Sequence, residues 1–147
     1  MPTAPSIQPN ILLVDDSADG LLVRKALLEE MGCRVRVAVN GVEALEKFES
    51  EAFDVIVTDY RMPRMDGIEL IQHVRKINPN ARIVLLSGFV EPLGLTEETT
   101  GADAVIAKTA LEVSHLTRSV KRLLSRGAMR KPPISQRRAV YAAHAAR

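Results

Sequence analysis

Five short apolar runs, separated by segments with helical periodicity, organise most of this 147-residue chain. The runs span residues 11–14, 35–39, 55–57, 83–86 and 104–107. Short, largely continuous runs rich in β-branched residues are typical of strands buried on both faces, as in a parallel sheet. Alternation of such strands with helices predicts right-handed βαβ units around one sheet.

The segments between and after the runs predict five helices, which span residues 17–31, 41–50, 67–77, 93–100 and 110–125. Ser17 is suited to cap the first helix and Gly32 to end it. On that helix, the residues that recur at helical spacing are Leu21, Leu22, Lys25, Leu28 and Glu29. The helix at 93–100 is the weakest prediction, because Pro92 and Gly94 disfavour a helical start and interior. The sequence therefore predicts an α/β fold with five strands and five helices.

Charge is unevenly distributed along the chain, although its net value is only +2. Residues 1–125 carry all 18 acidic residues and a net charge of −4, whereas residues 126–147 carry six basic residues and no acid. We expect a short N-terminal extension at residues 1–9, one domain at 10–126 and a basic C-terminal tail at 127–147. A basic stretch confined to the tail argues against a nucleic-acid-binding fold surface, and leaves contact with an acidic partner open.

Several classes of protein are disfavoured by what the sequence lacks. No apolar run approaches the ~20 residues that a membrane-spanning helix needs, and the first ten residues do not resemble a secretory signal. The single cysteine, Cys33, cannot form an internal disulfide. Neither of the glycine-rich patterns of nucleotide-binding loops is present. A cytoplasmic protein without membrane contact is the simplest expectation.

Polar residues stand where the predicted strands end, namely Asp15, Asp16, Asp59, Ser87 and Lys108. The carboxyl ends of parallel strands form one edge of an open α/β sheet, and ligands bind there. If the strand order is 2-1-3-4-5, the first and third strands are neighbours, and the three aspartates would then converge. The serine and the lysine should then close this cluster from the other side.

Three neighbouring carboxylates repel one another, and a hard divalent cation such as Mg²⁺ is the natural remedy. One of the carboxylates could then attack phosphorus and form an acyl phosphate. A lysine supplies mobile positive charge opposite the metal, and a hydroxyl can donate a hydrogen bond to the phosphoryl group. Positioning and charge neutralisation of this kind account for most of the catalysis of phosphoryl transfer.

Four motifs occur in order: Leu13 to Asp16, Asp54 to Gly67, Leu86 to Gly88, and Gly101 to Asp103 leading to Lys108. Together they resemble the receiver domain of two-component response regulators, relatives of the bacterial chemotaxis regulator. The resemblance covers about residues 10–125. It implies a flavodoxin-like, doubly wound sheet of five parallel strands in the order 2-1-3-4-5 with five helices.

The resemblance also implies a role for each acidic site residue. Asp59 matches the phosphorylated aspartate, and Asp15 and Asp16 match the acidic pair that binds Mg²⁺. Asp16 is expected to contact the metal directly, and Asp15 partly through water. Arg61 is expected to lend its backbone carbonyl to the metal.

The remaining roles implied by the resemblance concern the phosphoryl group. Ser87, Gly88 and Lys108 match the residues that stabilise it and switch the conformation. The phosphoryl donor would be a histidine kinase or a histidine phosphotransfer protein. The chain would act as a phosphoacceptor rather than as an enzyme, and would signal by conformational change to an output protein that the sequence does not identify.

The sequence departs from the family pattern at two positions. Val105 stands where the family usually has an aromatic residue, and Thr109 follows the lysine where the family usually has proline. Since a cis bond costs roughly 2.5–4 kcal/mol without proline, we expect the Lys108–Thr109 peptide bond to be trans. We also expect signalling to pass through the loop after Ser87 and residues 93–100.

Two other functions remain open. One is an interaction module that keeps the fold and works without phosphorylation. The other is an aspartyl-nucleophile phosphatase of the haloacid-dehalogenase type, which is disfavoured because Asp15-Asp16 lacks the spacer of an Asp-x-Asp pair. The sequence leaves the formation of a homodimer open as well.

Overall fold

The structure, a computed structural model, describes residues 8–88 and 94–129, and for residues 127–129 it describes the backbone alone. The N-terminal extension up to residue 7, residues 89–93 in the predicted signalling segment, and the tail from residue 130 lie outside the described residues. Within the described ranges, no helix combines the length and the apolar character needed to cross a membrane.

Five parallel strands form one sheet in the order β2-β1-β3-β4-β5, as the sequence predicts. The strands are β1 (Asn10–Val14), β2 (Arg34–Ala38), β3 (Val55–Asp59), β4 (Ile83–Ser87) and β5 (Ala104–Ala107). All five residues of β3 and of β4 are buried, because helices cover both faces of the sheet. The central strands therefore give a rigid support to whatever follows their carboxyl ends.

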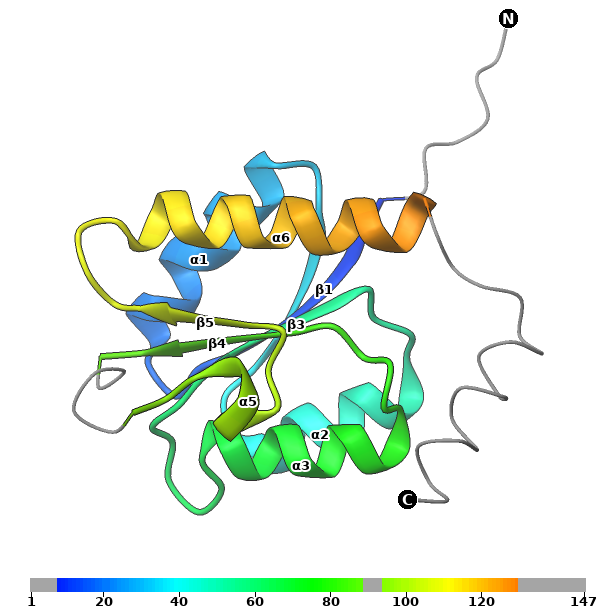
Figure 1. The fold of residues 1–147 in the computed structure, drawn as a ribbon, viewed down its shortest axis with the longest axis vertical. Coiled ribbons are helices and arrows are strands. Elements are labelled where there is room, and N and C mark those ends of the chain that lie inside the picture. Colours follow the sequence, from blue (N-terminus) through cyan, green and yellow to red (C-terminus); the bar gives the residue numbers. More distant parts are fainter. Residues whose placement is uncertain (1–7, 89–93, 130–147) are drawn as a thin grey trace, which may run out of the picture.

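Helices lie on both faces of this sheet (Figure 1). They are α1 (Ala18–Glu30), α2 (Gly41–Ser50), α3 (Gly67–Ile77), α5 (Glu97–Thr100) and α6 (Glu112–Met129). Helices α1 and α6 cover one face, and α2 and α3 cover the other. The predicted flavodoxin-like arrangement is confirmed.

Alternate residues of each central strand feed two separate cores. Ile11 and Leu13 of β1 face the α1–α6 side, where they pack with Leu28, and Leu12 faces the α2–α3 side, where it packs with Leu70. Each of these side chains is at most 1% exposed. Because a one-residue slip would exchange the two cores, this double burial fixes the strand register.

Only part of the helical pattern identified in α1 is buried. Leu22 is 70% exposed, and Lys25 and Glu29 form an exposed ion pair at 3.5 Å. The buried residues of the helix are Leu21, Arg24 and Leu28. These also recur at helical spacing, so the apolar pattern alone did not distinguish the two faces.

The last two helices differ in length from their predictions. Helix α5 covers only 97–100, where Thr96 caps its N-terminus, rather than 93–100. Helix α6 begins at Glu112, after a turn in which the Thr109 hydroxyl accepts a hydrogen bond from the Leu111 N–H. It continues to Met129 rather than Ser125, so the predicted domain boundary at residue 126 falls inside the helix.

One arginine near the end of α3 ties down the segment that leads into β5. The Arg75 guanidinium donates hydrogen bonds to the carbonyl oxygens of Pro79 at 2.9 Å, Gly101 at 2.8 Å, and Ala81. It also forms an ion pair with Asp103 at 3.1 Å. The C-terminal end of α5 is thereby attached to α3.

Candidate functional site

Three carboxylates meet at the carboxyl ends of β1 and β3. Asp15 and Asp16 follow β1, and Asp59 is the last residue of β3. One oxygen of each lies within 4.8 Å of the other two. Asp15 and Asp59 are 2% and 6% exposed, whereas Asp16 is exposed. The parallel pairing of β1 with β3 thus brings the predicted acidic residues together.

The Asp59 carboxylate has a positive charge beside it. Its Oδ1 atom lies 2.6 Å from the Lys108 ammonium and accepts a hydrogen bond from the Tyr60 N–H at 3.0 Å. Burial raises the pKa of Asp59 above its usual value, and the nearby charge of Asp15 adds to this rise. The lysine and the Tyr60 N–H oppose the rise by stabilising the charged form.

Asp15 is held by donors from α1. Its Oδ1 atom accepts a hydrogen bond from the Ser17 N–H at 2.9 Å, and its Oδ2 atom lies 2.6 Å from Nη1 of Arg24. The same arginine binds Glu112 on α6, with Nε–Oε2 at 3.0 Å and Nη2–Oε1 at 3.1 Å. Both oxygens of this aspartate are therefore engaged by the chain itself.

The loop after β3 closes against the strand through a glycine. The Gly67 N–H donates to the Tyr60 carbonyl at 2.7 Å, and a Cβ at this position would overlap the Asp59 carbonyl oxygen. Asp66 caps α3 by accepting from the Glu69 N–H at 2.8 Å. Only glycine permits this close approach, which sets the path of the loop beside the acidic cluster.

A hollow opens between this loop and the acidic cluster, with a volume of about 430 Å³. The residues that line it are Asp16, Tyr60, Arg61, Met62, Pro63 and Asp66. Arg61, predicted to offer its backbone carbonyl, is thus placed at the same hollow as the exposed carboxylate. This space is open to water and to a small ligand.

The other side of the site is formed by β4 and β5. Ser87 is 1% exposed at the end of β4, and Gly88 beyond it is exposed. The Lys108 N–H donates a hydrogen bond to the Ser87 carbonyl at 3.0 Å. This backbone contact positions the lysine beside the acidic cluster. Val105 is half-buried against the α2–α3 core. The described residues contain no cis peptide bond, so the prediction of a trans Lys108–Thr109 bond is confirmed.

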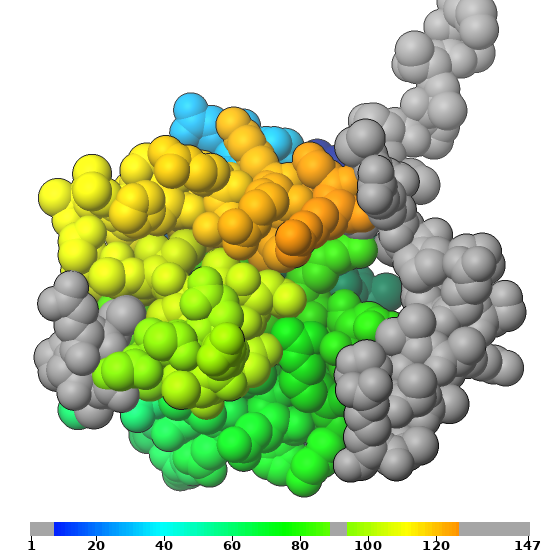
Figure 2. Space-filling model, viewed as in Figure 1, coloured from blue at the N-terminus to red at the C-terminus, as the bar shows by residue number. Residues whose placement is uncertain are grey.

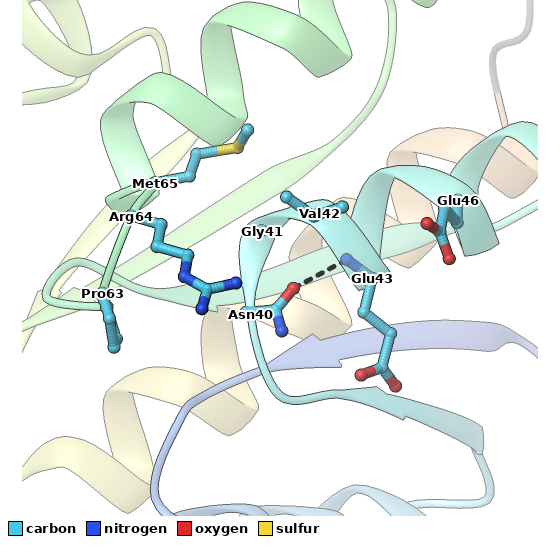
Figure 3. Close-up of a pocket in the computed structure, with 8 residues that line it drawn as sticks. All are labelled: Asn40, Gly41, Val42, Glu43, Glu46, Pro63, Arg64 and Met65. Carbon is cyan, nitrogen blue, oxygen red and sulfur yellow. Dashed lines mark hydrogen bonds between the residues drawn. The ribbon is translucent and has the colours of Figure 1, made fainter.

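A second hollow lies beside the site rather than in it. Figure 3 shows Pro63, Arg64 and Met65 of the loop after β3 facing the N-terminus of α2, where Asn40 accepts from the Glu43 N–H at 2.8 Å. Arg64 has a positive φ of 71°. None of the three clustered aspartates lines this hollow.

Sequence reasoning missed the residues that hold Asp15, namely Arg24 and Glu112. One signal was available: a charged residue at position 24 falls between Leu21 and Leu28 on an apolar face. The partner on α6 was not accessible in this way, because it lies 88 positions further along the chain. Gly20 was also missed, although a Cβ there would overlap the carboxylate of Asp15.

The acidic cluster has the chemistry that Mg²⁺ prefers. Its donors are all carboxylate oxygens, and one of the three side chains is exposed, which leaves room for water ligands. Lys108 is 30% exposed at the side chain and stands opposite as a countercharge. The residues present therefore fit a Mg²⁺ ion together with a phosphoryl group.

Comparison with known proteins gives the same picture. A family model described as the response regulator receiver domain matches residues 11–121. The receiver protein CpdR of Brucella abortus is 30% identical over 114 residues, which cover 78% of this chain and 95% of that protein. The transcriptional regulatory protein ZraR of Klebsiella oxytoca is 38% identical over 82 residues, and these span 56% of this chain but only 18% of ZraR.

Solved structures are similar in the same way. The response regulator TrrA of Thermotoga maritima, crystallised with Mg²⁺ and BeF, has a TM-score of 0.73 at 32% identity. The match covers 80% of this chain and all of TrrA. TrrA has also been crystallised in complex with the histidine kinase ThkA. Together with the fold and the acidic cluster, these matches show that the chain belongs to the response regulator receiver domains of two-component signalling.

Proposed function

We propose that Asp59 takes up a phosphoryl group from a phosphohistidine of a histidine kinase or phosphotransfer protein, with Mg²⁺ bound beside it. One observation carries this proposal. The Asp59 carboxylate lies 2.6 Å from the Lys108 ammonium within a cluster of three carboxylates. A nucleophile, ligands for a hard cation and a positive charge thus occupy one place.

The three aspartates would contribute to Mg²⁺ binding in different ways. Asp16 and Asp59 would bind Mg²⁺ directly, with the backbone carbonyl of Arg61 as a third protein ligand. Asp15 would act through water, because both of its oxygens already accept hydrogen bonds from the chain. When bound, Mg²⁺ would neutralise charge on the phosphoryl oxygens.

The transfer itself is a displacement at phosphorus. A carboxylate oxygen of Asp59 forms the new O–P bond while the P–N bond to the donor imidazole breaks, and the electron pair returns to that nitrogen. The Lys108 ammonium, which lies beside Asp59, would then form an ion pair with the transferred phosphoryl group. The Ser87 hydroxyl and the Gly88 N–H would donate hydrogen bonds to its oxygens.

Exposed apolar side chains beside the site support docking of a protein donor. Leu22 and Val23 on α1 are 70% and 62% exposed, and Leu111 just before α6 and Val113 in its first turn are 59% and 51% exposed. The ion pair between Arg24 and Glu112 joins these two elements. TrrA, which resembles this chain, is found in complex with a histidine kinase. We propose that these side chains contact the donor, and that the exchange takes place in the cytoplasm.

Acetyl phosphate and Mg²⁺ provide the test. The intact mass of the wild-type chain should rise by one phosphoryl group, and that of Asp59→Asn should not. Asp19→Asn is a matched control, since this exposed aspartate in the first turn of α1 lies outside the cluster. Normal phosphorylation of Asp59→Asn would contradict the proposal.

The same preparation separates the other two functions. A phosphatase would release the alcohol from a generic phosphate ester over many turnovers, which we do not expect. An interaction module that works without phosphorylation would leave the wild-type mass unchanged under all conditions. Either result would replace the proposed function.

A further inference from the structure

A buried arginine reaches the acidic cluster from α1. Arg24 is only 9% exposed and occupies the buried face of the helix. Its Nη1 atom lies 2.6 Å from Oδ2 of Asp15, and its Nε and Nη2 atoms bind the two carboxylate oxygens of Glu112. The guanidinium therefore links the residue that follows β1 to α1 and α6.

The helix makes room for this contact at Gly20, one turn before the arginine. A Cβ at position 20 would overlap Oδ2 of Asp15 and would stand 2.8 Å from Nη1 of Arg24. Any side chain larger than hydrogen would separate the two charged groups. The pair thus depends on a glycine in the first turn of α1, since only glycine leaves the space between the two charged groups free.

The arginine remains charged in this environment. Burial alone would lower its pKa, but hydrogen bonding to Glu112 and the charges of Glu112, Asp15 and Asp59 raise it overall. A permanent positive charge therefore lies in contact with one member of the acidic cluster.

We propose that Arg24 is a positioning residue that weakens the binding of Mg²⁺ to the acidic cluster. This inference rests on the proposed function, in which Asp15, Asp16 and Asp59 form the Mg²⁺ site. The guanidinium occupies one oxygen of Asp15 and opposes the approach of a second cation by like-charge repulsion. The domain would then bind Mg²⁺ less tightly than three carboxylates alone would.

Titration of the purified full-length chain with MgCl2 in a calorimeter tests this. Arg24→Gln removes the charge and should tighten Mg²⁺ binding, on the order of tenfold. Arg24→Lys keeps the charge without the planar fork, and should return the affinity to within about twofold of wild type, because repulsion depends on charge and distance rather than on shape.

A residue that only held the fold together would give a different pattern. Glu112→Gln also breaks the bridge but leaves the arginine charged, so Mg²⁺ binding should stay the same or weaken. A purely structural bridge predicts the same direction of change in Arg24→Gln and Glu112→Gln. The melting temperature without Mg²⁺ reports the fold of each variant separately.

Removing one partner of a buried ion pair can unfold a protein, so a second variant is needed. Arg24→Gln with Glu112→Gln leaves neither charge of the bridge behind. It should also bind Mg²⁺ more tightly than wild type, because the positive end of the pair is the one in contact with Asp15.

The outcomes of the inference and of the proposed function are distinct. If wild type binds Mg²⁺ and neither Arg24→Gln nor the double variant binds it more tightly, the inference is overturned while the proposed function stands. If wild type gives no binding heat or spectroscopic change with MgCl2, both are overturned.

Discussion

The acidic half of the site and the segment at 94–100 are built in different ways. The acidic half, formed by Asp15, Asp16 and Asp59, is fixed by contacts between elements far apart in sequence. The segment at 94–100, which includes α5, is held by hydrogen bonds among close neighbours. The Thr96 hydroxyl accepts from the Thr99 N–H at 3.1 Å, and the Thr100 hydroxyl donates to the Thr96 carbonyl at 2.7 Å.

We expect this difference to separate ligand binding at the acidic half from conformational change in the segment at 94–100. Long-range ties place the acidic groups before any ligand arrives, so little ordering is left for the moment of binding. A four-residue helix held by local hydrogen bonds opens at low free energy, and segments that move in switching proteins come from this class. In the space-filling view, α5 lies on the surface between α3 and α6, where a partner protein could contact it (Figure 2).

The largest effect is expected from a methyl group in the acidic half. Gly67→Ala would place a Cβ against the Asp59 carbonyl oxygen and 2.8 Å from Leu85 Cδ1. We expect a loss of about 3 kcal/mol in the free energy of unfolding, within the range for overpacking. Urea titration measures it. Gly88→Ala is the control on the other half, since a Cβ there meets no atom of the described, non-neighbouring residues within 4 Å, and it should change stability by about 0.5 kcal/mol or less.

The two neighbouring aspartates should differ in their contribution to metal binding. Asp16→Asn removes an exposed carboxylate that is free to bind Mg²⁺ directly, so the affinity should fall about tenfold or more, or at least 1.4 kcal/mol. Asp15→Asn should cost less, because its oxygens are already engaged. Calorimetric titration with MgCl2 compares them, and a larger loss in Asp15→Asn would reverse the assignment.

Removing the negative charge of Asp59 should stabilise the fold in the absence of Mg²⁺. Because burial raises the pKa of Asp59 in the folded state, ionisation of this carboxyl disfavours folding. The cost is absent below the unfolded pKa of about 4 and grows as pH rises through the folded pKa. Asp59→Asn should therefore melt at a higher temperature than wild type at pH 7. The difference should shrink as pH falls toward about 4, and a lower melting temperature at pH 7 would contradict the argument.

A helix cap should matter locally in α5. Thr96→Ala removes the N-cap of a four-residue helix, at a cost of about 1 kcal/mol. Amide exchange at residues 97–100 should then become about fivefold faster with little change in the melting temperature. Ser17→Ala, at the cap of α1, is the comparison, and should change exchange less because Arg24 anchors that helix.

The apolar runs predicted the strands because double-sided burial leaves a clear pattern, and the convergence of Asp15, Asp16 and Asp59 followed once the family resemblance supplied the strand order. The sequence did not predict the ion pairs of Arg24. The burial of this arginine can be explained only when its partners, Asp15 after β1 and Glu112 on α6, are known. The end of α6 was misplaced because the residues after Ser125 were assigned to a basic tail, whereas the helix continues through Gly127 to Met129. Such errors arise where contacts between distant residues override local pattern.

The smallest effect is expected from the C-terminal tail. Deleting residues 130–147 leaves all five strands and α6 intact. The melting temperature should shift by less than about 2 °C, and phosphorylation by acetyl phosphate should be unchanged. A shift of several degrees would show that the tail contributes to the folded unit.

The attachment of Arg75 to Gly101 has a mechanical consequence. This arginine holds the carbonyl of Gly101 and the carboxylate of Asp103, so α5 is anchored at its C-terminal end. The glycine itself has a φ of 81°, a backbone conformation that other residues seldom adopt. Because Arg75 holds the C-terminal end of α5, we expect any displacement of this helix to rotate it about Gly101 rather than translate it along the surface. A partner that contacts α5 would then respond to the orientation of the helix.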